Sequence, residues 1–115
     1  MSREIGKSAE DAAARYLTSR GYILLQRNYA IYGAEVDIIA ADRGYIAFVE
    51  VRYRASLHPL SPRESVTTAK RRRICAAALV WLQQNGLQDA NVRFDIVEVS
   101  PLGITLLRAA FLFTE

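Results

Sequence analysis

Cysteine, histidine and long apolar runs are nearly absent from this chain of 115 residues. Cys75 is the single cysteine, which excludes an internal disulfide and a zinc site built from several cysteines. His58 is the single histidine and stands beside Pro59, so we interpret it as a solvated loop residue. No apolar run approaches the ~20 residues of a membrane span, and Met1–Glu4 lacks the apolar core of a signal peptide. These absences predict a cytoplasmic protein without a membrane segment.

Apolar residues nevertheless make up 51% of the chain, which is typical of a globular protein. The length suits one domain over residues 1–115 with a single core. Charge is unevenly spread: Arg52–Arg73 holds seven basic residues and one acidic residue, Glu64, whereas the remaining segments hold eight basic and eleven acidic residues. This local surplus suits a polyanion such as nucleic acid, although a solvated basic helix face would give the same composition.

Hydrophobic spacing and turn residues predict seven elements. Apolar residues at helical spacing predict a helix over residues 3–20, ended by Gly21. Ser61-Pro62 and Glu64 are helix-start signals, and they predict a second helix over residues 62–85. Strand patterns cover residues 22–31, 36–41, 45–51, 92–99 and 104–113. The order α-β-β-β-α-β-β predicts an α/β fold, a mixed β-sheet flanked by helices, in which the second helix crosses over between parallel strands.

The stretch Tyr32–Arg54 carries the strongest chemical signal. Its two apolar runs flank Asp42-Arg43-Gly44, which is the pattern of a β-hairpin. Side chains alternate between the two faces along each strand. If the loop is Arg43-Gly44, side chains of the same face stand directly opposite each other across the hairpin. A three-residue loop would put these pairs out of register. Counting back from the turn places two pairs opposite each other on that face: Asp37 with Glu50, and Glu35 with Arg52.

The facing carboxylates of Asp37 and Glu50 need a compensating partner. Like charges on opposite residues destabilise a sheet, and the apolar neighbours predict burial, which is costly for an unpaired charge. A shared proton, an arginine or a divalent cation would offset this cost, and oxygen ligands suit Mg²⁺ or Mn²⁺. The alternative is a Glu35–Arg52 ion pair with one of the other carboxylates in solvent, and spacing alone does not choose between them.

Asp37 followed by Glu50-Val51-Arg52 resembles the Asp…Glu-x-Lys core of PD-(D/E)xK nucleases. A wider set of positions matches a known pattern, with Phe48–Arg54 as its most specific part, and the others are Gly6, Glu10, Gly21-Tyr22, Asn28, Glu35, Asp37, Lys70 and Arg93-Phe94-Asp95. Through these positions the chain is similar, over nearly its whole length, to the YraN family of small bacterial proteins, which resembles archaeal Holliday junction resolvases. The resemblance implies a restriction-endonuclease-like fold and a metal-dependent nuclease that hydrolyses phosphodiester bonds in DNA, including branched DNA.

The resemblance further implies residue roles. The metal ligands for Mg²⁺ or Mn²⁺ would be Asp37, Glu50, Glu10 and Glu35, with the backbone carbonyl of Val51. The catalytic residues would be Glu10, Asp37, Glu50, Arg52 and Lys70. The basic cluster, apart from the resemblance, would supply the nucleic-acid-binding residues Arg52, Arg54, Arg63, Lys70, Arg71, Arg72 and Arg73.

Two positions depart from the family pattern. Arg52 stands in the place of the motif lysine, and Ala34 stands where the family usually has glycine, with Gly33 one residue earlier. Arginine binds phosphate but stays protonated and cannot act as a base. Helical spacing places Lys70 on the same stripe as Ile74, facing the sheet, so Lys70 would be able to supply the missing ammonium group.

Three functions remain open from the sequence. The first is a nuclease, which the carboxylates Asp37, Glu50 and Glu10 favour. The second is a non-catalytic nucleic-acid-binding module on a nuclease scaffold, which arginine at position 52 favours. The third is an assembly protein in which the apolar run Ile104–Phe113 forms a homodimer surface, although a buried strand explains that run equally well.

Overall fold

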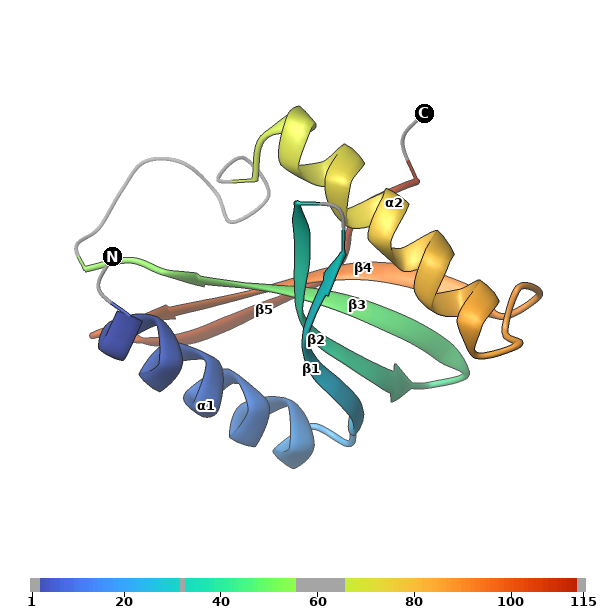
Figure 1. The fold of residues 1–115 in the computed structure, drawn as a ribbon. Coiled ribbons are helices and arrows are strands. Elements are labelled where there is room, and N and C mark those ends of the chain that lie inside the picture. The colour runs from blue at the N-terminus through green and yellow to red at the C-terminus, as the bar shows by residue number, and fades with distance from the viewer. Residues whose placement is uncertain (1–2, 32, 56–65, 114–115) are drawn as a thin grey trace.

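The chain forms one mixed five-stranded sheet with two helices in a computed structural model that describes residues 3–31, 33–55 and 66–113 (Figure 1). Among the described strands only β3 and β4 are parallel neighbours, and the strands follow chain order across the sheet. The predicted α/β class, element order and crossover are therefore confirmed. The elements are α1 (Arg3–Ser19), β1 (Ile23–Ile31), β2 (Ala34–Asp42), β3 (Tyr45–Tyr53), α2 (Thr68–Gln84), β4 (Asn91–Ser100) and β5 (Gly103–Phe111).

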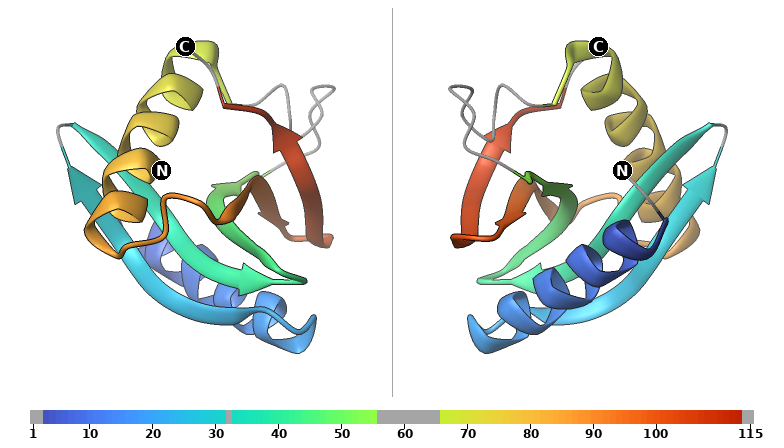
Figure 2. Two further views of the ribbon diagram at one scale, coloured as in Figure 1. Left: turned by 90° about the vertical axis from the view of Figure 1, so that its right-hand side faces the viewer. Right: turned by 90° about the vertical axis from the view of Figure 1, so that its left-hand side faces the viewer.

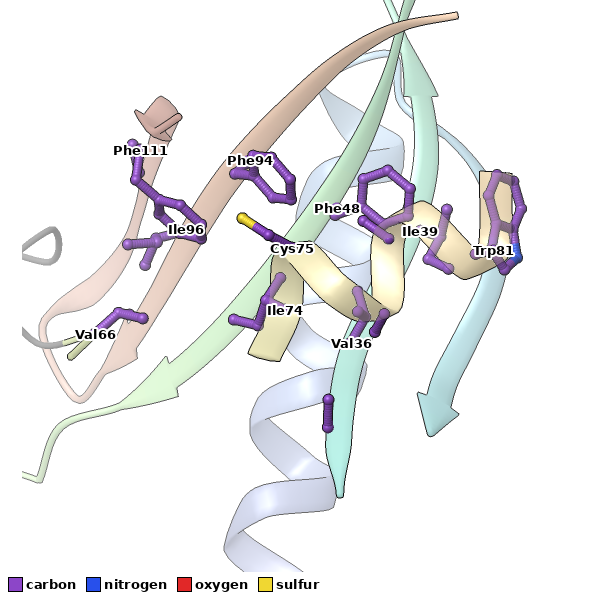
Figure 3. Packing of buried hydrophobic residues seen from close by; sticks show 14 of the residues in the cluster. Val36, Ile39, Phe48, Val66, Ile74, Cys75, Trp81, Phe94, Ile96 and Phe111 are labelled. Carbon is purple, nitrogen blue, oxygen red and sulfur yellow. The ribbon is translucent and has the colours of Figure 1, made fainter. Parts of the chain in front are cut away.

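The two helices cover opposite faces of the twisted sheet (Figures 1 and 2). On one face α1 buries Leu17 against a cluster that includes Val49. On the other face α2 buries Trp81, whose ring meets Phe48 edge-on at 5.8 Å between centroids (Figure 3). The sheet thus separates two apolar clusters, one under each helix. Within the described part of the chain, neither helix is long and apolar enough to cross a membrane.

The turn of the central hairpin follows the predicted register. Arg43 and Gly44 form the loop with φ values of 54° and 82°, and Asp42 pairs with Tyr45. Positive φ at both loop residues is the geometry that matches the twist of a two-residue hairpin. Cross-strand pairing then runs as far as Ile38 opposite Val49.

Strand β2 changes the face that it covers at Asp37. Val36 packs in the cluster under α2, whereas Ile38 packs in the cluster under α1. A regular strand would place residues two apart on the same face. The strict alternation of side chains, which predicts Glu35 and Asp37 on one face, is therefore wrong at this point of β2. On the neighbouring strand, Asn28 takes a left-handed φ of 54°, which asparagine tolerates better than most residues. Asp37 therefore lies where the two faces meet.

Two element boundaries differ from the sequence prediction. Val66 and Thr67 are not helical, and α2 begins at Thr68 with Thr67 as its N-cap, so the prediction of one continuous helix through residues 66 and 67 is wrong. The Thr67 hydroxyl accepts a hydrogen bond from the Lys70 backbone N–H at 3.2 Å, which stabilises this later start. The start signals Ser61-Pro62 and Glu64 lie outside the described residues, as do His58 and Arg63.

Strand β5 ends at Phe111, two residues before the predicted end. Beyond this residue, the Phe113 ring packs edge-on against Phe94 with 4.8 Å between the ring centroids. The apolar run therefore continues past the strand because Phe113 contributes to side-chain packing rather than to the sheet.

A buried ion-pair network joins β4 to its neighbours. Asp95 is fully buried and accepts hydrogen bonds from the Arg93 guanidinium at 2.8 and 2.9 Å, the Tyr22 hydroxyl at 2.7 Å and the Ala109 N–H at 3.0 Å. Arg93 also reaches Asp42 Oδ2 at 2.6 Å. Burial raises the pKa of Tyr22, so its hydroxyl stays a donor. A compensated buried network of this kind holds the fold together.

Candidate metal and phosphate site

A cleft of about 360 Å³ opens beyond the last cross-strand pair of β2 and β3, beside the first turns of α2. Gly33 takes a left-handed φ of 76°, so the turn before β2 has its glycine one residue earlier than the family pattern. The residues that line the cleft are Gly33, Ala34, Glu35, Asp37, Glu50, Lys70, Arg73 and Ile74.

Asp37 and Glu50 interact directly in this cleft. Burial, the charge of Glu50 and a hydrogen bond to the Glu50 carboxyl group together raise the pKa of Asp37 to about 8. The Val51 N–H, which donates to Asp37 Oδ2 at 2.7 Å, and the ammonium of Lys70 oppose this shift. The pair of carboxyl groups therefore holds a proton at neutral pH. A proton held by the pair is one of the three partners, beside an arginine and a divalent cation, that the sequence leaves open for these carboxylates.

Glu50 contributes a buried oxygen that no hydrogen bond satisfies. The side chain is 5% exposed, and Oε2 has no hydrogen-bond partner among the described residues. Lys70 Nζ lies 3.2 Å from this oxygen as an ion pair without hydrogen-bond geometry. A buried acceptor without a hydrogen bond is costly and uncommon in proteins. The Glu50 carboxylate therefore keeps an acceptor that a cation in the cleft would satisfy.

Helix α1 brings a further carboxylate to the same place. One oxygen each from Glu10, Glu35 and Asp37 lie within 4.8 Å of one another, so these three residues could hold a metal ion. Burial raises the pKa of Glu10, and the charge of Asp37 adds to the shift, whereas Arg27 opposes it. With its amide nitrogen turned toward Glu10, Asn28 donates to both carboxylate oxygens at 2.8 and 3.2 Å. Asn28 thus orients Glu10, as residues behind metal ligands commonly do.

Sequence reasoning did not assign the partners of Glu10. Arg27 Nη2 lies 3.6 Å from Glu10 and 2.7 Å from Asp11, next to Asn28 on β1. The available signal was the polar interruption Gln26-Arg27-Asn28 inside an otherwise apolar strand. Arg27 and Asn28 line a second cleft of about 660 Å³ together with Glu10, and this cleft adjoins the first because Glu35 lines both.

The predicted basic residues have different environments. Arg52 is partly buried and is not among the residues that line the Asp37 cleft. Arg54 forms an ion pair with Glu98, and both side chains are largely buried. Lys70 and Arg73 line the cleft, so the structure brings Lys70 to the carboxylates as the helical spacing predicts.

The other arginines of α2 also differ from one another. Arg71 donates its Nε–H to the Val66 carbonyl at 2.9 Å and lies over the Phe111 ring at 5.2 Å, whereas Arg72 and Arg73 are exposed. Arg71 therefore contributes to the packing between α2 and the end of β5. Arg63 lies outside the described residues.

Comparison with known proteins identifies the family. The chain matches the pattern of the "Uncharacterised protein family UPF0102" over residues 9–99, a span that includes Glu10, Asp37, Glu50 and Lys70. UPF0102 proteins from Symbiobacterium thermophilum and Desulforapulum autotrophicum are 43% and 39% identical to it. The first alignment covers 88% of this chain and 86% of the Symbiobacterium protein. The second covers 96% of this chain and 95% of the Desulforapulum protein. The chain therefore belongs to the uncharacterised UPF0102 family, which is the YraN-like family that its motifs predict.

Proposed function

We propose that this protein is a divalent-metal-dependent nuclease that hydrolyses phosphodiester bonds of DNA in the cleft between β2, β3 and α2. The carrying observation is the unsatisfied, buried Oε2 of Glu50 beside Asp37, within reach of a cleft that also holds Glu35. A bound cation would satisfy this oxygen, and a group of carboxylate oxygens suits a hard cation such as Mg²⁺ or Mn²⁺.

The residues present fit such a cation. Asp37 and Glu50 would hold it from the hairpin, with Glu35 and Glu10 as further oxygen ligands. When bound, the cation would polarise the scissile phosphate and lower the pKa of a bound water. Asn28 and the Val51 N–H would orient the ligands Glu10 and Asp37, because each donates a hydrogen bond to the carboxylate concerned.

The proposed reaction is hydrolysis, in which water adds across one phosphodiester bond. The water oxygen would bond to phosphorus as the bond from phosphorus to O3′ breaks, and water would return a proton to O3′. The products would be a 5′-phosphate and a 3′-hydroxyl. The exposed Arg72 and Arg73 would attract the phosphate backbone, because their charges stand without an acidic partner in the same turn of α2.

A DNA-binding module without cleavage is the second candidate. The observation that favours it is the position of Arg52, which replaces the motif lysine and is not among the residues that line the cleft. Such a module would keep the basic residues of α2 as phosphate contacts. Its affinity for DNA would fall steeply with salt, but it would release no product.

A cleavage assay separates the two candidates. Purified protein would be incubated with single-stranded, duplex and four-way-junction DNA in Mg²⁺, Mn²⁺ or EDTA. We expect metal-dependent products with 5′-phosphate ends on at least one substrate, and loss of those products in Asp37→Asn and Glu50→Gln. The matched control is Asp89→Asn, because Asp89 is an exposed acidic residue that lines neither cleft.

The outcomes of that assay are distinct. Binding without cleavage of any substrate in either metal would defeat the nuclease and favour the binding module. Cleavage that persists in both Asp37→Asn and Glu50→Gln would show that a contaminating enzyme or another site is responsible.

A further inference from the structure

We propose that Lys70 is a displaceable cation, which neutralises Glu50 in the metal-free protein and contacts the scissile phosphate once a divalent cation has bound. This inference rests on the proposed function and assigns the basic catalytic role to α2 rather than to Arg52. A phosphoryl transition state gains negative charge on its equatorial oxygens, so a cation placed beside it accelerates the reaction. The residue that places a positive charge beside the phosphate is therefore expected to affect the rate of the reaction.

The backbone of Lys70 is fixed, whereas its side chain reaches into the cleft. Thr67 caps α2 by accepting the Lys70 N–H at 3.2 Å, and its carbonyl accepts the Arg71 N–H at 2.9 Å. The Lys70 side chain is 33% exposed and its Nζ lies 3.2 Å from Glu50 Oε2, while Glu50 is 5% exposed. The ammonium group thus stands between the buried carboxylate and the open side of the cleft.

The Lys70–Glu50 contact is suited to exchange. The two groups attract by charge but lack the geometry of a hydrogen bond, so little directional bonding is lost when they separate. Lysine carries a compact charge on a flexible stem and is able to turn toward solvent at low cost. A divalent cation on Glu50 would repel the ammonium, because two positive charges cannot neutralise the same carboxylate oxygen at close range.

Arg52 does not occupy an equivalent position. It follows Glu50 by two residues on β3 and pairs with Glu98 in the register of the parallel neighbour β4. The residues that line the cleft include Lys70 and Arg73 and do not include Arg52. Because its side chain is also partly buried, Arg52 is better placed to pack at the end of the sheet than to meet a phosphate in the cleft.

Two measurements on the full chain test the inference. The affinity for Mn²⁺, without DNA, would be measured by the electron paramagnetic resonance signal of free Mn²⁺, and cleavage would be measured on the best substrate. We expect Lys70→Met to bind Mn²⁺ several-fold more tightly than wild type, because the competing charge is gone. The same variant should lose cleavage by about 100-fold, the typical effect of removing one group that stabilises the transition state.

Matched variants keep the interpretation specific. Lys70→Arg should restore Mn²⁺ affinity to the wild-type value because it restores the charge. Arg52→Met, and Arg15→Met at an exposed position on α1, should each leave Mn²⁺ affinity unchanged and retain cleavage within a few-fold. Melting temperatures of all variants, measured without metal, would confirm that each has folded before its affinity is compared.

The outcomes separate this inference from the proposed function. Equal Mn²⁺ affinity in wild type and Lys70→Met would overturn displacement, and loss of cleavage in Arg52→Met but not in Lys70→Met would overturn the assigned role. If wild type binds Mn²⁺ but cleaves no DNA, the proposed function and the phosphate contact fail, while the affinity comparison still decides displacement. If wild type binds no Mn²⁺, the metal site and displacement fail together.

Discussion

The backbone N–H of Val51 donates a hydrogen bond to Asp37 Oδ2 at 2.7 Å, just beyond the last cross-strand pair of β2 and β3. At the end of the hairpin, the Asp37 carboxylate thus accepts the hydrogen bond of a backbone N–H group. This contact holds Asp37 at the point where β2 changes faces, between Glu50 and the carboxylate that α1 supplies. The chemistry of the cleft depends on this arrangement.

The first prediction concerns Glu50→Gln. The change removes one buried charge, and the Lys70 side chain is already partly exposed to solvent, so the melting temperature without metal should stay level or rise. Mn²⁺ should raise the melting temperature of wild type by mass action but not that of the variant. Differential scanning fluorimetry at several Mn²⁺ concentrations gives both numbers, with Asp89→Asn as the exposed acidic control. Equal responses to Mn²⁺ in all three proteins would contradict the metal site.

The second prediction concerns pH and Asp37. Its pKa is about 8 in the folded protein and ~3.9 in an unfolded chain, so between these values the folded state holds the extra proton. The free energy of unfolding contributed by this group should therefore be fully present below pH ~4 and fall as pH rises toward 8. Asp37→Asn mimics the protonated side chain and should flatten that fall. Urea titrations at pH 5 and pH 8 would test it, and the same pH dependence in both proteins would count against the buried pair.

The third prediction concerns protons released by metal. Because Asp37 holds a proton at neutral pH and a metal ligand must be deprotonated, Mn²⁺ binding at pH 7 should release about one proton. Calorimetry in buffers with different ionisation enthalpies counts that proton. At pH 9 the count should approach zero, because Asp37 is then already ionised. A proton count that does not change between the two pH values would show that Asp37 is not a ligand.

The fourth prediction concerns the buried network at β4. Asp95→Asn should lower the free energy of unfolding by about 3 kcal/mol, because it leaves the largely buried Arg93 side chain without one of its carboxylate partners. Tyr22→Phe removes one hydrogen bond to Asp95 and should cost about 1 kcal/mol. Urea denaturation measures both values. Neither change should alter Mn²⁺ affinity by more than a few-fold, and a large loss in Tyr22→Phe would show that the network and the cleft are coupled.

The fifth prediction concerns the exposed arginines of α2. Replacing Arg72 and Arg73 with alanine should reduce the slope of log affinity for DNA against log salt by up to about two units, if each contacts one phosphate. The melting temperature should barely change, because both side chains are exposed. Arg71→Ala should instead lower the melting temperature, because Arg71 bonds to Val66 and covers Phe111. The control for slope is Arg15→Ala on α1, and an unchanged slope in the double variant would mean that Arg72 and Arg73 are only solvated.

The sequence by itself determined the features that depend on near neighbours. The order of elements follows from local periodicity, and the Arg43-Gly44 loop sets the register of the hairpin as far as Ile38 and Val49. Helical spacing likewise predicted that Lys70 faces the sheet, and the structure places it over Glu50. Each of these relationships is set by backbone geometry over a few residues or across one tight turn.

Tertiary structure alone decided how those parts meet. Spacing on α1 gave no reason to bring Glu10 to Asp37, and only the packing of α1 on the sheet does so. Counting alternate residues along β2 could not reveal that this strand changes faces at Asp37. Helical spacing likewise could not reveal that the Arg71 side chain lies over the Phe111 ring. Such contacts join residues far apart in the chain, and burial and steric fit between whole elements select them, which local sequence patterns do not record.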